Sequence, residues 1–547
     1  MIQIFILSFL VTFFYTPFGI IFEKGKNTRS FSLQLIFGLI LLSFLSLLIN
    51  FFYSLNLHIN SIILLSSFII IWKYKKLYLT KKYIIFCLIS ASIIFLLITK
   101  SNVYRPDAGL YHLPYISTLI NEKIILGLSN IHFRFGHVSI IQYVSAISYN
   151  FLFDHNGIVF PSSLVVTGVI LNFLSNINNY IKKNKFHLHF FFIFSLLIFI
   201  FYKINRYSEY GNDAPSHLLL FLLVSEIIKN YKIIKNKKFS NLLLLSFFIV
   251  MNKIILLFSI FFLVIFYKKK NVWLKIVNRR NLFALTFMVM WIFKNVLVSG
   301  CLLFPVSITC ISNLAWTNEK LAKEVSIENE AWAKGWPDYR KTNVKLSQTI
   351  YLEDFNWLKT WSKNHFKKIS KIILPYFIFL LIFLFIIKQR VSKFNIENYL
   401  KSLIGISILG TLVWLLKVPV FRYGYSYLIL SISLIFSLVG SNLILKNNKH
   451  LIFKATISIF LIIFTAKNLN RIIFDLGKYY NYPWPKFYSM NEGNNLKELK
   501  YKFVGEKKVY YSKDGHCMYG YSPCGIQFDK IKYKKLFSYS LFYNSSD

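Results

Sequence analysis

The chain has 547 residues, of which 55% are hydrophobic, and its mean hydropathy is +0.51. This composition is too apolar for a soluble domain and indicates a multi-span membrane protein. The formal net charge of +42 could suggest a nucleic-acid partner, but most lysines and arginines fall in short loops between apolar segments. Basic loops beside membrane helices set orientation, so no nucleic-acid binding is expected.

Apolar runs long enough to cross, or nearly cross, a bilayer make up most of the chain. They lie at about 2–22, 31–53, 60–73, 83–99, 158–177, 188–204, 215–231, 281–298, 370–387, 402–417, 425–445 and 451–467. The first run lacks a basic leading segment and a small-residue cleavage site, so we expect a retained helix. The predicted fold is an all-α polytopic bundle of about 12–14 transmembrane helices.

The run 241–267 is interrupted near its middle by Asn252 and Lys253. A charge at the centre of a bilayer is costly. Basic residues both precede and follow the run, so both of its ends are expected on the cytoplasmic side. We therefore predict two short helices that form a hairpin, with Lys253 near the outer turn.

The apolar segment 138–153 is predicted to lie on the outer membrane surface. A membrane crossing at this segment would place Lys182, Lys183 and Lys185 outside, against the positive-inside rule. Three long segments are then expected outside: the loop 100–157 with surface helices at about 109–121 and 138–153, the loop 299–368, and the tail 468–547.

The outer tail contains alternating stretches typical of strands and is predicted to form a small extracytoplasmic cap. Its Cys517 and Cys524 stand in GHCMYGYSPCG. Gly and Pro between the two cysteines favour a disulfide-closed loop in an oxidising compartment over a zinc site. Whether Cys301 and Cys310 also pair is left open.

Polar side chains gather on the predicted outer side of the bundle. They are Asp107 and Glu122 in the first outer loop, Glu209 and Asp213 in the second, Lys253 at the hairpin, Lys294 and Asn295 near the end of a span, and Arg422 and Tyr423 in KVPVFRYG. Converging charges are expensive near lipid and usually functional. Interfacial snorkelling explains a single lysine better than it explains the carboxylates.

One chemistry suits these groups. A carboxylate can accept the proton of an attacking hydroxyl while cations stabilise a departing phosphate. An inverting sugar transfer from a lipid-linked phosphate needs one such base, a role predicted for Asp107. Arg422 is the first choice for the phosphate because a guanidinium binds it bidentately. The other substrate-binding candidates are Arg134, Lys253, Tyr111 and His112. Asp213 or Glu209 could hold a divalent metal such as Mg, Mn or Zn.

The order of these features resembles the GT-C superfamily of integral-membrane glycosyltransferases. In that superfamily a helix, here 83–99, leads to a long outer loop with surface helices, and the first acid of the loop is catalytic. Asp107 in RPDAGLYHLPYISTLINEK and Asp213 in EYGNDAP match its two acidic motifs, and KNVLVSGCLLFPVS and VPVFRYG resemble bacterial GT-C-like proteins. The resemblance divides the chain into leading helices 1–82, a GT-C-like module 83–467 and the tail 468–547.

The resemblance implies transfer of a sugar from a polyprenyl-phosphate donor to an envelope glycan, lipid or protein, at the outer face of a bacterial inner membrane. The single Asp in PDAGLYH and the lack of a Trp-Trp-Asp motif disfavour protein N-glycosylation. Two alternatives stay open: an O-antigen polymerase-like or ligase-like enzyme, and a lipid-glycan flippase or transporter. A transporter should place charges at mid-membrane on broken helices, often with internal repeats. No repeat is found, which favours an enzyme.

Overall fold

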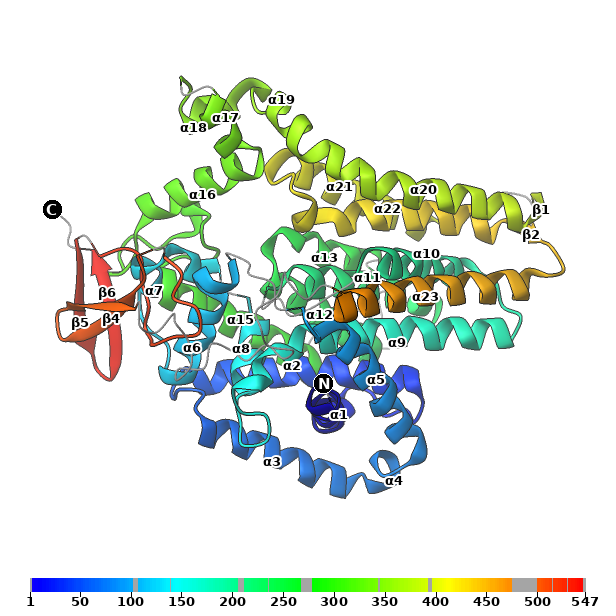
Figure 1. Ribbon diagram of the computed structural model, residues 1–547, viewed down its shortest axis with the longest axis horizontal. Coiled ribbons are helices and arrows are strands. Elements are labelled where there is room, and N and C mark those ends of the chain that lie inside the picture. The colour runs from blue at the N-terminus through cyan, green and yellow to red at the C-terminus, as the bar shows by residue number, and fades with distance from the viewer. Residues whose placement is uncertain are drawn as a thin grey trace.

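The computed structural model describes residues 2–101, 107–137, 139–204, 211–234, 236–266, 278–342, 345–391, 396–474, 499–513, 515–528 and 530–544. The chain is mainly helical, and its long helices run along the longest axis of the molecule (Figure 1). Over these residues nine helical segments are long and apolar enough to cross a membrane: Ile2–Ile21, Thr28–Asn50, Lys81–Ile98, Asp154–Lys182, Arg279–Ser299, Leu358–Ile387, Asn398–Lys417, Phe421–Ser441 and Lys449–Phe474. The protein is therefore an all-α, multi-pass membrane protein, as predicted.

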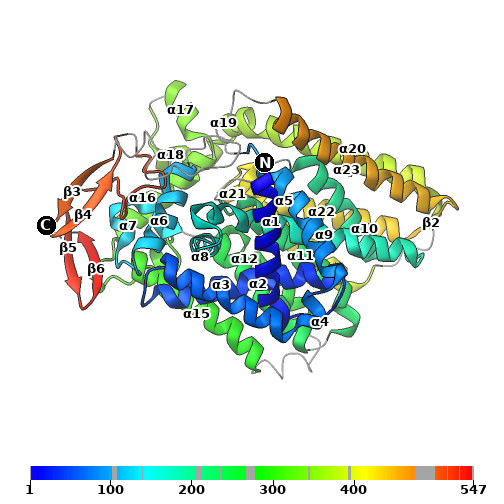
Figure 2. The same ribbon diagram turned by 60° about the horizontal axis from the view of Figure 1, so that its bottom comes forward.

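The N-terminal helices form one side of the bundle (Figure 2). They are α1 (Ile2–Tyr15) with the 3₁₀ turn η1 (Thr16–Ile21), α2 (Thr28–Asn50), α3 (Leu57–Lys73), α4 (Lys75–Tyr78) and α5 (Lys81–Ile98). Side-chain oxygens start three of these helices by accepting from backbone N–H groups: Asn27 for α2, Asn56 for α3 and Thr80 for α5. Helices α2 and α5 pack against α9 (Phe160–Lys182), so the leading helices are part of the bundle.

The centre of the bundle contains α10 (Leu188–Lys203) and α11 (Asp213–Asn230). From Phe190 to Phe201 every residue of α10 is buried, and a helix that is apolar on all sides belongs in such a core. The outer helices α20 (Lys367–Ile387) and α23 (Lys449–Phe474) instead expose apolar side chains: Phe385 is 80% exposed and Leu451 is 72% exposed. These faces are the ones that lipid would cover.

The segment with Lys253 folds back on itself, as the hairpin prediction requires. Helix α12 (Asn236–Asn252) ends where Lys253 becomes extended, and short turns follow: η6 (Ile254–Leu256), α13 (Phe258–Phe261) and η7 (Phe262–Phe266). Ser259 Oγ donates to the carbonyl of Ser246 at 3.2 Å, so the two arms lie side by side. Helix α15 (Arg279–Ser299) then packs against α12.

The first outer loop is more buried and more broken than expected. It contains the π turn η2 (Ala108–His112), α6 (Leu113–Asn121), α7 (Leu128–Ile131), η3 (Phe133–His137), α8 (Ile141–Ile147) and η4 (Asp154–Val159). Residues Leu113–Ile120 of α6 are all buried, because α8 packs against this helix and the C-terminal tail covers another part of it. The predicted helix 138–153 is shortened to α8. Asn150 Oδ1 accepts from the backbone N–H groups of Leu152 and Phe153, and such local bonds compete with helix.

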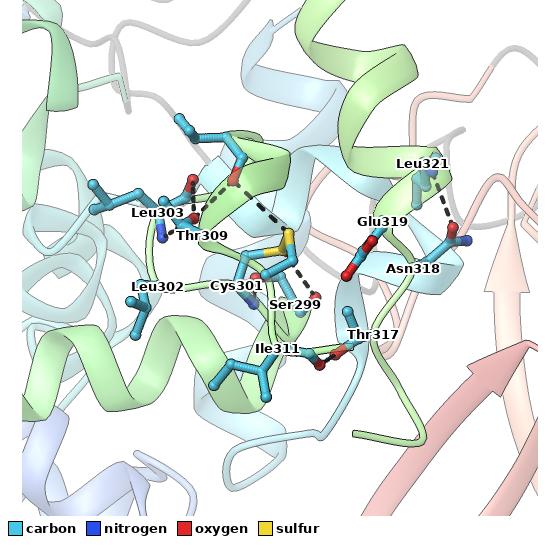
Figure 3. The surroundings of a disulfide bond; sticks show 12 residues. Ser299, Cys301, Leu302, Leu303, Thr309, Ile311, Thr317, Asn318, Glu319 and Leu321 are labelled. Carbon is cyan, nitrogen blue, oxygen red and sulfur yellow. Dashed lines mark hydrogen bonds between the residues drawn. A yellow bond between two sulfur atoms is a disulfide. The ribbon is translucent and has the colours of Figure 1, made fainter. Parts of the chain in front are cut away.

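After α15 the chain enters the second large loop through a disulfide between Cys301 and Cys310 (Figure 3). Gly300 has a φ of +77° and ends α15, and Leu302 N–H donates to the carbonyl of Thr309 at 3.0 Å across the closed turn. The loop then forms α16 (Glu319–Ala333), α17 (Trp336–Thr342), α18 (Gln348–Leu352) and α19 (Leu358–Trp361).

Helices α20, α21 (Asn398–Lys417) and α22 (Phe421–Ser441) complete the bundle. Strands β1 (Lys388–Val391) and β2 (Leu443–Leu445) pair antiparallel at the end of the molecule opposite the tail (Figure 1). The tail forms two antiparallel hairpins, β3 (Lys500–Val504) with β4 (Lys507–Tyr511) and β5 (Ile531–Leu536) with β6 (Tyr539–Asn544). Between the hairpins, Cys517 is disulfide-bonded to Cys524.

Candidate functional site

Four charged side chains from four separate elements meet at the end of the bundle that also holds the tail. We call Asp107, Asp213, Lys253 and Arg422 the outer cluster. Arg422 Nη1 donates to Asp107 Oδ2 at 2.8 Å, and Lys253 Nζ binds the Asp213 carboxylate. Arg422 Nε lies 3.9 Å from Asp213 Oδ2, so the two pairs form one network. The structure thus brings together four of the residues singled out in the sequence.

Asp107 precedes the π turn η2, and Pro114 follows two residues after the end of this turn. Proline has no N–H, so it leaves carbonyl groups of the preceding turn without a helical donor. His132 Nε2 donates to the carbonyl of Leu110 at 3.0 Å, and the N–H of Met518 donates to that of Gly109 at 3.0 Å. π turns are frequent at functional sites because they redirect side chains.

Asp213 is the first residue of α11, where a carboxylate interacts favourably with the helix dipole. Its neighbour Asn212 donates to the carbonyl of Asn252, beside Lys253. The Asn252 side chain accepts from Ser139 Oγ at 2.8 Å and from the N–H of Ile141 at 3.1 Å. Asn252 therefore fixes the hairpin, the start of α11 and the start of α8 in one place.

Arg422 is held by the short turn between α21 and α22. Trp414 Nε1 donates to the carbonyl of Val420 at 2.9 Å, and Trp361 Nε1 donates to that of Pro419 at 2.8 Å. A Cβ on Gly424 would lie 2.2 Å from the Trp414 ring, so glycine is needed for this close approach. Trp361 is thus buried and is part of the support for Arg422.

Two neighbours fix the backbone of Arg422. Its carbonyl accepts from Lys253 Nζ at 3.0 Å and from His217 Nε2 at 2.8 Å. His217 Nδ1 is hydrogen-bonded to Ser426 Oγ at 2.7 Å, so both ring nitrogens of His217 have partners. Aromatic rings border the cations: the Arg422 guanidinium carbon is 5.7 Å from the Trp332 ring and 5.1 Å from the Tyr423 ring.

Arg134, Tyr111 and His112 lie beside Asp107. The Arg134 guanidinium carbon is 5.4 Å from the Tyr111 ring centre, and no carboxylate pairs with Arg134 within the described part of the chain. His112 Nδ1 accepts from Gln142 Nε2 at 2.5 Å, which leaves its Nε2 facing Gly211, next to Asp213. Burial lowers the pKa of His112 to about 4 and raises that of Tyr111, so both groups are neutral hydrogen-bonding groups near pH 7.

The outer cluster is electrically balanced but incompletely covered. Two carboxylates face two cations, and the exposed side-chain fractions are 28% for Asp107, 28% for Asp213, 42% for Arg422 and 9% for Lys253. Arg134 adds one positive charge that none of these carboxylates neutralises. The described side chains together therefore favour the approach of an anion.

The described residues fit a divalent metal poorly. Among them no group of three or more His, Cys, Asp or Glu side chains is placed to hold a metal ion. The Asp213 carboxylate already faces Lys253 and Arg422, which a metal would have to displace. Glu209, the other metal candidate, lies outside the described residues. Metal binding at Asp213 stays a prediction.

Other predicted outer charges lie elsewhere. Glu122 pairs with Lys507 of the tail at 2.5 Å. Lys294 is 1% exposed in α15, with its Nζ 5.8 Å from the Trp291 ring, and Asn295 donates to the carbonyl of Leu302 at 3.0 Å. These three residues support the fold around the site and do not belong to the outer cluster.

Residues 1–429 match the model of a family described as a domain of unknown function (DUF8201). The chain belongs to this family. The matched region contains the whole outer cluster and the leading helices, and it ends before the tail with β3–β6. Comparison with curated proteins finds no match, and comparison with solved structures finds none either.

Proposed function

We propose that this protein is a GT-C-like membrane glycosyltransferase that moves a sugar from a polyprenyl-phosphate donor to an acceptor hydroxyl in the cell envelope. The observation that supports it best is the outer cluster, in which Arg422 is shared by Asp107 and Asp213, and Asp213 also binds Lys253. A base beside a phosphate-binding cation is the combination that an inverting transfer needs.

In the proposed reaction Asp107 removes the proton from the acceptor hydroxyl. The hydroxyl oxygen attacks the anomeric carbon, the bond from that carbon to the phosphate oxygen breaks, and the electron pair leaves with the polyprenyl phosphate. Arg422, Lys253 and Arg134 stabilise the charge on that phosphate, and no step is routed through a metal ion.

The ion pair between Asp107 and Arg422 gives the proposed reaction an order. With Arg422 Nη1 bound at 2.8 Å, the Asp107 carboxylate is engaged by the guanidinium and is not free to face an acceptor hydroxyl. A donor phosphate that binds Arg422 bidentately would compete with Asp107 and release it toward the acceptor. The donor should therefore bind first, and the base should become active only when the phosphate is in place.

Two further features support an active site on the outer face of a bacterial inner membrane. Both disulfides, Cys301–Cys310 and Cys517–Cys524, belong to the loop and tail predicted to be outside, while Cys87 in α5 is unpaired and buried. Disulfides persist in oxidising compartments. The polymerase-like and ligase-like alternatives would use the same kind of donor and differ in the acceptor.

The test is a transfer assay with purified protein and a panel of labelled polyprenyl-phosphate sugars, comparing wild type with Asp107→Asn. The variant should lose about 10³-fold in rate and keep the wild-type melting temperature. Asp154→Asn is the matched control, because Asp154 is an exposed acid of the same outer loop and its φ of +48° suits asparagine. Undiminished transfer by Asp107→Asn would reject the proposal.

A further inference from the structure

The C-terminal tail carries a high density of positive charge that is separate from the outer cluster. Residues 499–544 contain nine lysines and three acids, a net charge of +6. Lys507 pairs with Glu122, but most of the other lysines lie on the exposed strands β3 and β5. A basic surface of this kind attracts polyanions over several ångströms.

The hairpin β3–β4 also presents an exposed row of aromatic rings. Cross-strand partners point to the same face, and here Tyr501 pairs with Tyr510 and Phe503 with Lys508. Tyr501 is 52% exposed and Phe503 is 66% exposed. Tyr521 extends the row by stacking on Tyr510, with ring centres 5.0 Å apart. We call these five residues the aromatic face.

On the opposite face of the same hairpin, the valines are covered. Val504 and Val509 are 7% and 0% exposed, and the aromatic face is therefore the side left open. Lys508 Nζ lies 3.9 Å from the Tyr501 ring centre, and this cation–π contact places the ammonium group beside the aromatic rings. Contiguous exposed apolar surface with a fixed charge is typical of a binding site.

We infer that the aromatic face binds an acidic glycan chain, a polysaccharide whose sugar rings carry carboxylate or phosphate groups. Sugar rings have apolar C–H faces that pack on aromatic rings, and Lys508, the lysine on the same face of the hairpin, would pair with the acidic groups. The tail lies beyond α6 and α7, at the end of the molecule opposite β1–β2 (Figures 1 and 2), which favours a polymer in solution over a membrane surface.

The tail also connects this face to the outer cluster. Met518 and His516, between β4 and β5, lie against Gly109, two residues after Asp107. A glycan bound on the tail would therefore lie close to the proposed reaction centre. Binding of the glycan does not depend on the proposed transferase activity. A role for the bound glycan as the acceptor of the sugar rests on that proposed function.

The experiment uses full-length protein in nanodiscs of neutral phosphatidylcholine and fluorescent polygalacturonate as the probe, with dextran as the uncharged polymer. Wild type should bind polygalacturonate saturably, more weakly at high salt, and should not bind dextran. The triple variant Tyr501→Ser, Phe503→Ser, Lys508→Glu should weaken binding about tenfold or more. Lys508→Glu alone should weaken it less, and serves if the triple variant does not fold.

The matched control is Trp72→Ser with Lys75→Glu, which removes an exposed lysine–aromatic pair from the other end of the molecule and should leave binding unchanged. Equal binding by wild type and a folded triple variant would overturn the inference. So would binding to phosphatidylglycerol vesicles but not to polygalacturonate, since the face would then be a membrane contact. Either result would leave the Asp107→Asn comparison, which needs no tail binding, unaffected.

Discussion

The outer cluster has a counterpart at the other end of α11, and the two differ in how completely their charges are paired. At the inner end Arg29 Nη2 donates to both carboxylate oxygens of Glu226, at 3.0 and 2.9 Å. Asn230 Nδ2 donates to the same carboxylate at 3.2 Å, and the Glu226 side chain is 7% exposed. We call Arg29 and Glu226 the inner pair.

The comparison separates a structural ion pair from one that is proposed to be reactive. The inner pair joins α2 to α11 with short bonds in a covered position, which is the geometry that stabilises a buried charge. In the outer cluster Arg422 is divided between two carboxylates, one of them 3.9 Å away, and is 42% exposed. Groups that are only partly satisfied and partly exposed can exchange one partner for a substrate at low cost.

The largest difference in stability should come from the inner pair. Arg29→Met leaves Glu226 charged and buried, and should cost about 3 kcal/mol of unfolding free energy. Adding Glu226→Leu removes both charges and should restore most of that loss. The free energies are measured by denaturant unfolding in mild detergent. If the double variant were as unstable as Arg29→Met, the inner pair would not be a charge-compensating clamp.

Breaking the pair between Asp213 and Lys253 should lower both the stability of the protein and the transfer rate. Asp213→Asn removes the carboxylate that faces Lys253, which is 9% exposed and among the described residues keeps the carbonyl of Arg422 and the Tyr423 ring as neighbours. We expect a loss of about 2 kcal/mol in stability and about 100-fold in transfer rate. Rate and melting temperature are measured on the same preparation. A fully active Asp213→Asn variant would place Asp213 with the structural residues.

A smaller effect should follow from removing the cation without a carboxylate partner. Arg134→Gln should raise the KM for the polyprenyl-phosphate donor about tenfold, equivalent to about 1.4 kcal/mol. It should leave the melting temperature unchanged, because Arg134 forms no ion pair with a described residue. Arg134→Lys should recover part of the loss. A change in kcat alone would mean that Arg134 does not bind the donor.

The smallest predicted effect is a loss of unfolding free energy at acid pH that is caused by protonation of His112. Its folded-state pKa of about 4 lies below the ordinary value of 6.5, so the unfolded chain binds the proton first as the pH falls. Well above pH 6.5, where this residue is deprotonated in both the folded and the unfolded state, it contributes no pH dependence. Between pH 7 and 5.5 it should cost about 1 kcal/mol of stability. His112→Gln should reduce the slope of unfolding free energy against pH in this range, and an identical slope would contradict the burial of neutral His112.

Much of the outer cluster could be predicted because membrane sequence patterns are strong. Charges among apolar runs are conspicuous, and the basic loops fix sidedness, so Asp107, Asp213, Lys253 and Arg422 could be assigned to one end. The supporting side chains could not be found in this way. Asn252 and Gln142 are uncharged amides in buried segments, and only the fold shows that they hold the hairpin and His112.

The inner pair and the burial of the outer-loop helices were missed for related reasons. Arg29 reads as one more basic loop residue, and Glu226 lies 197 positions away inside an apolar run. The burial of α6 depends in part on a tail about 400 residues later in the chain, where the carbonyl of Gly520 accepts from Ser117 Oγ. Local periodicity contains no information about such distant partners.

The most direct test of the distinction between the two regions is a thermal-shift titration with undecaprenyl phosphate. A ligand that binds only the folded state adds about 2.7 kcal/mol of stability at a hundredfold excess over its dissociation constant. Wild type and Arg29→Lys should show equal upward shifts from different starting temperatures, and Arg422→Gln should show almost none. An undiminished shift in Arg422→Gln would contradict the proposal that the outer cluster is a phosphate-binding site.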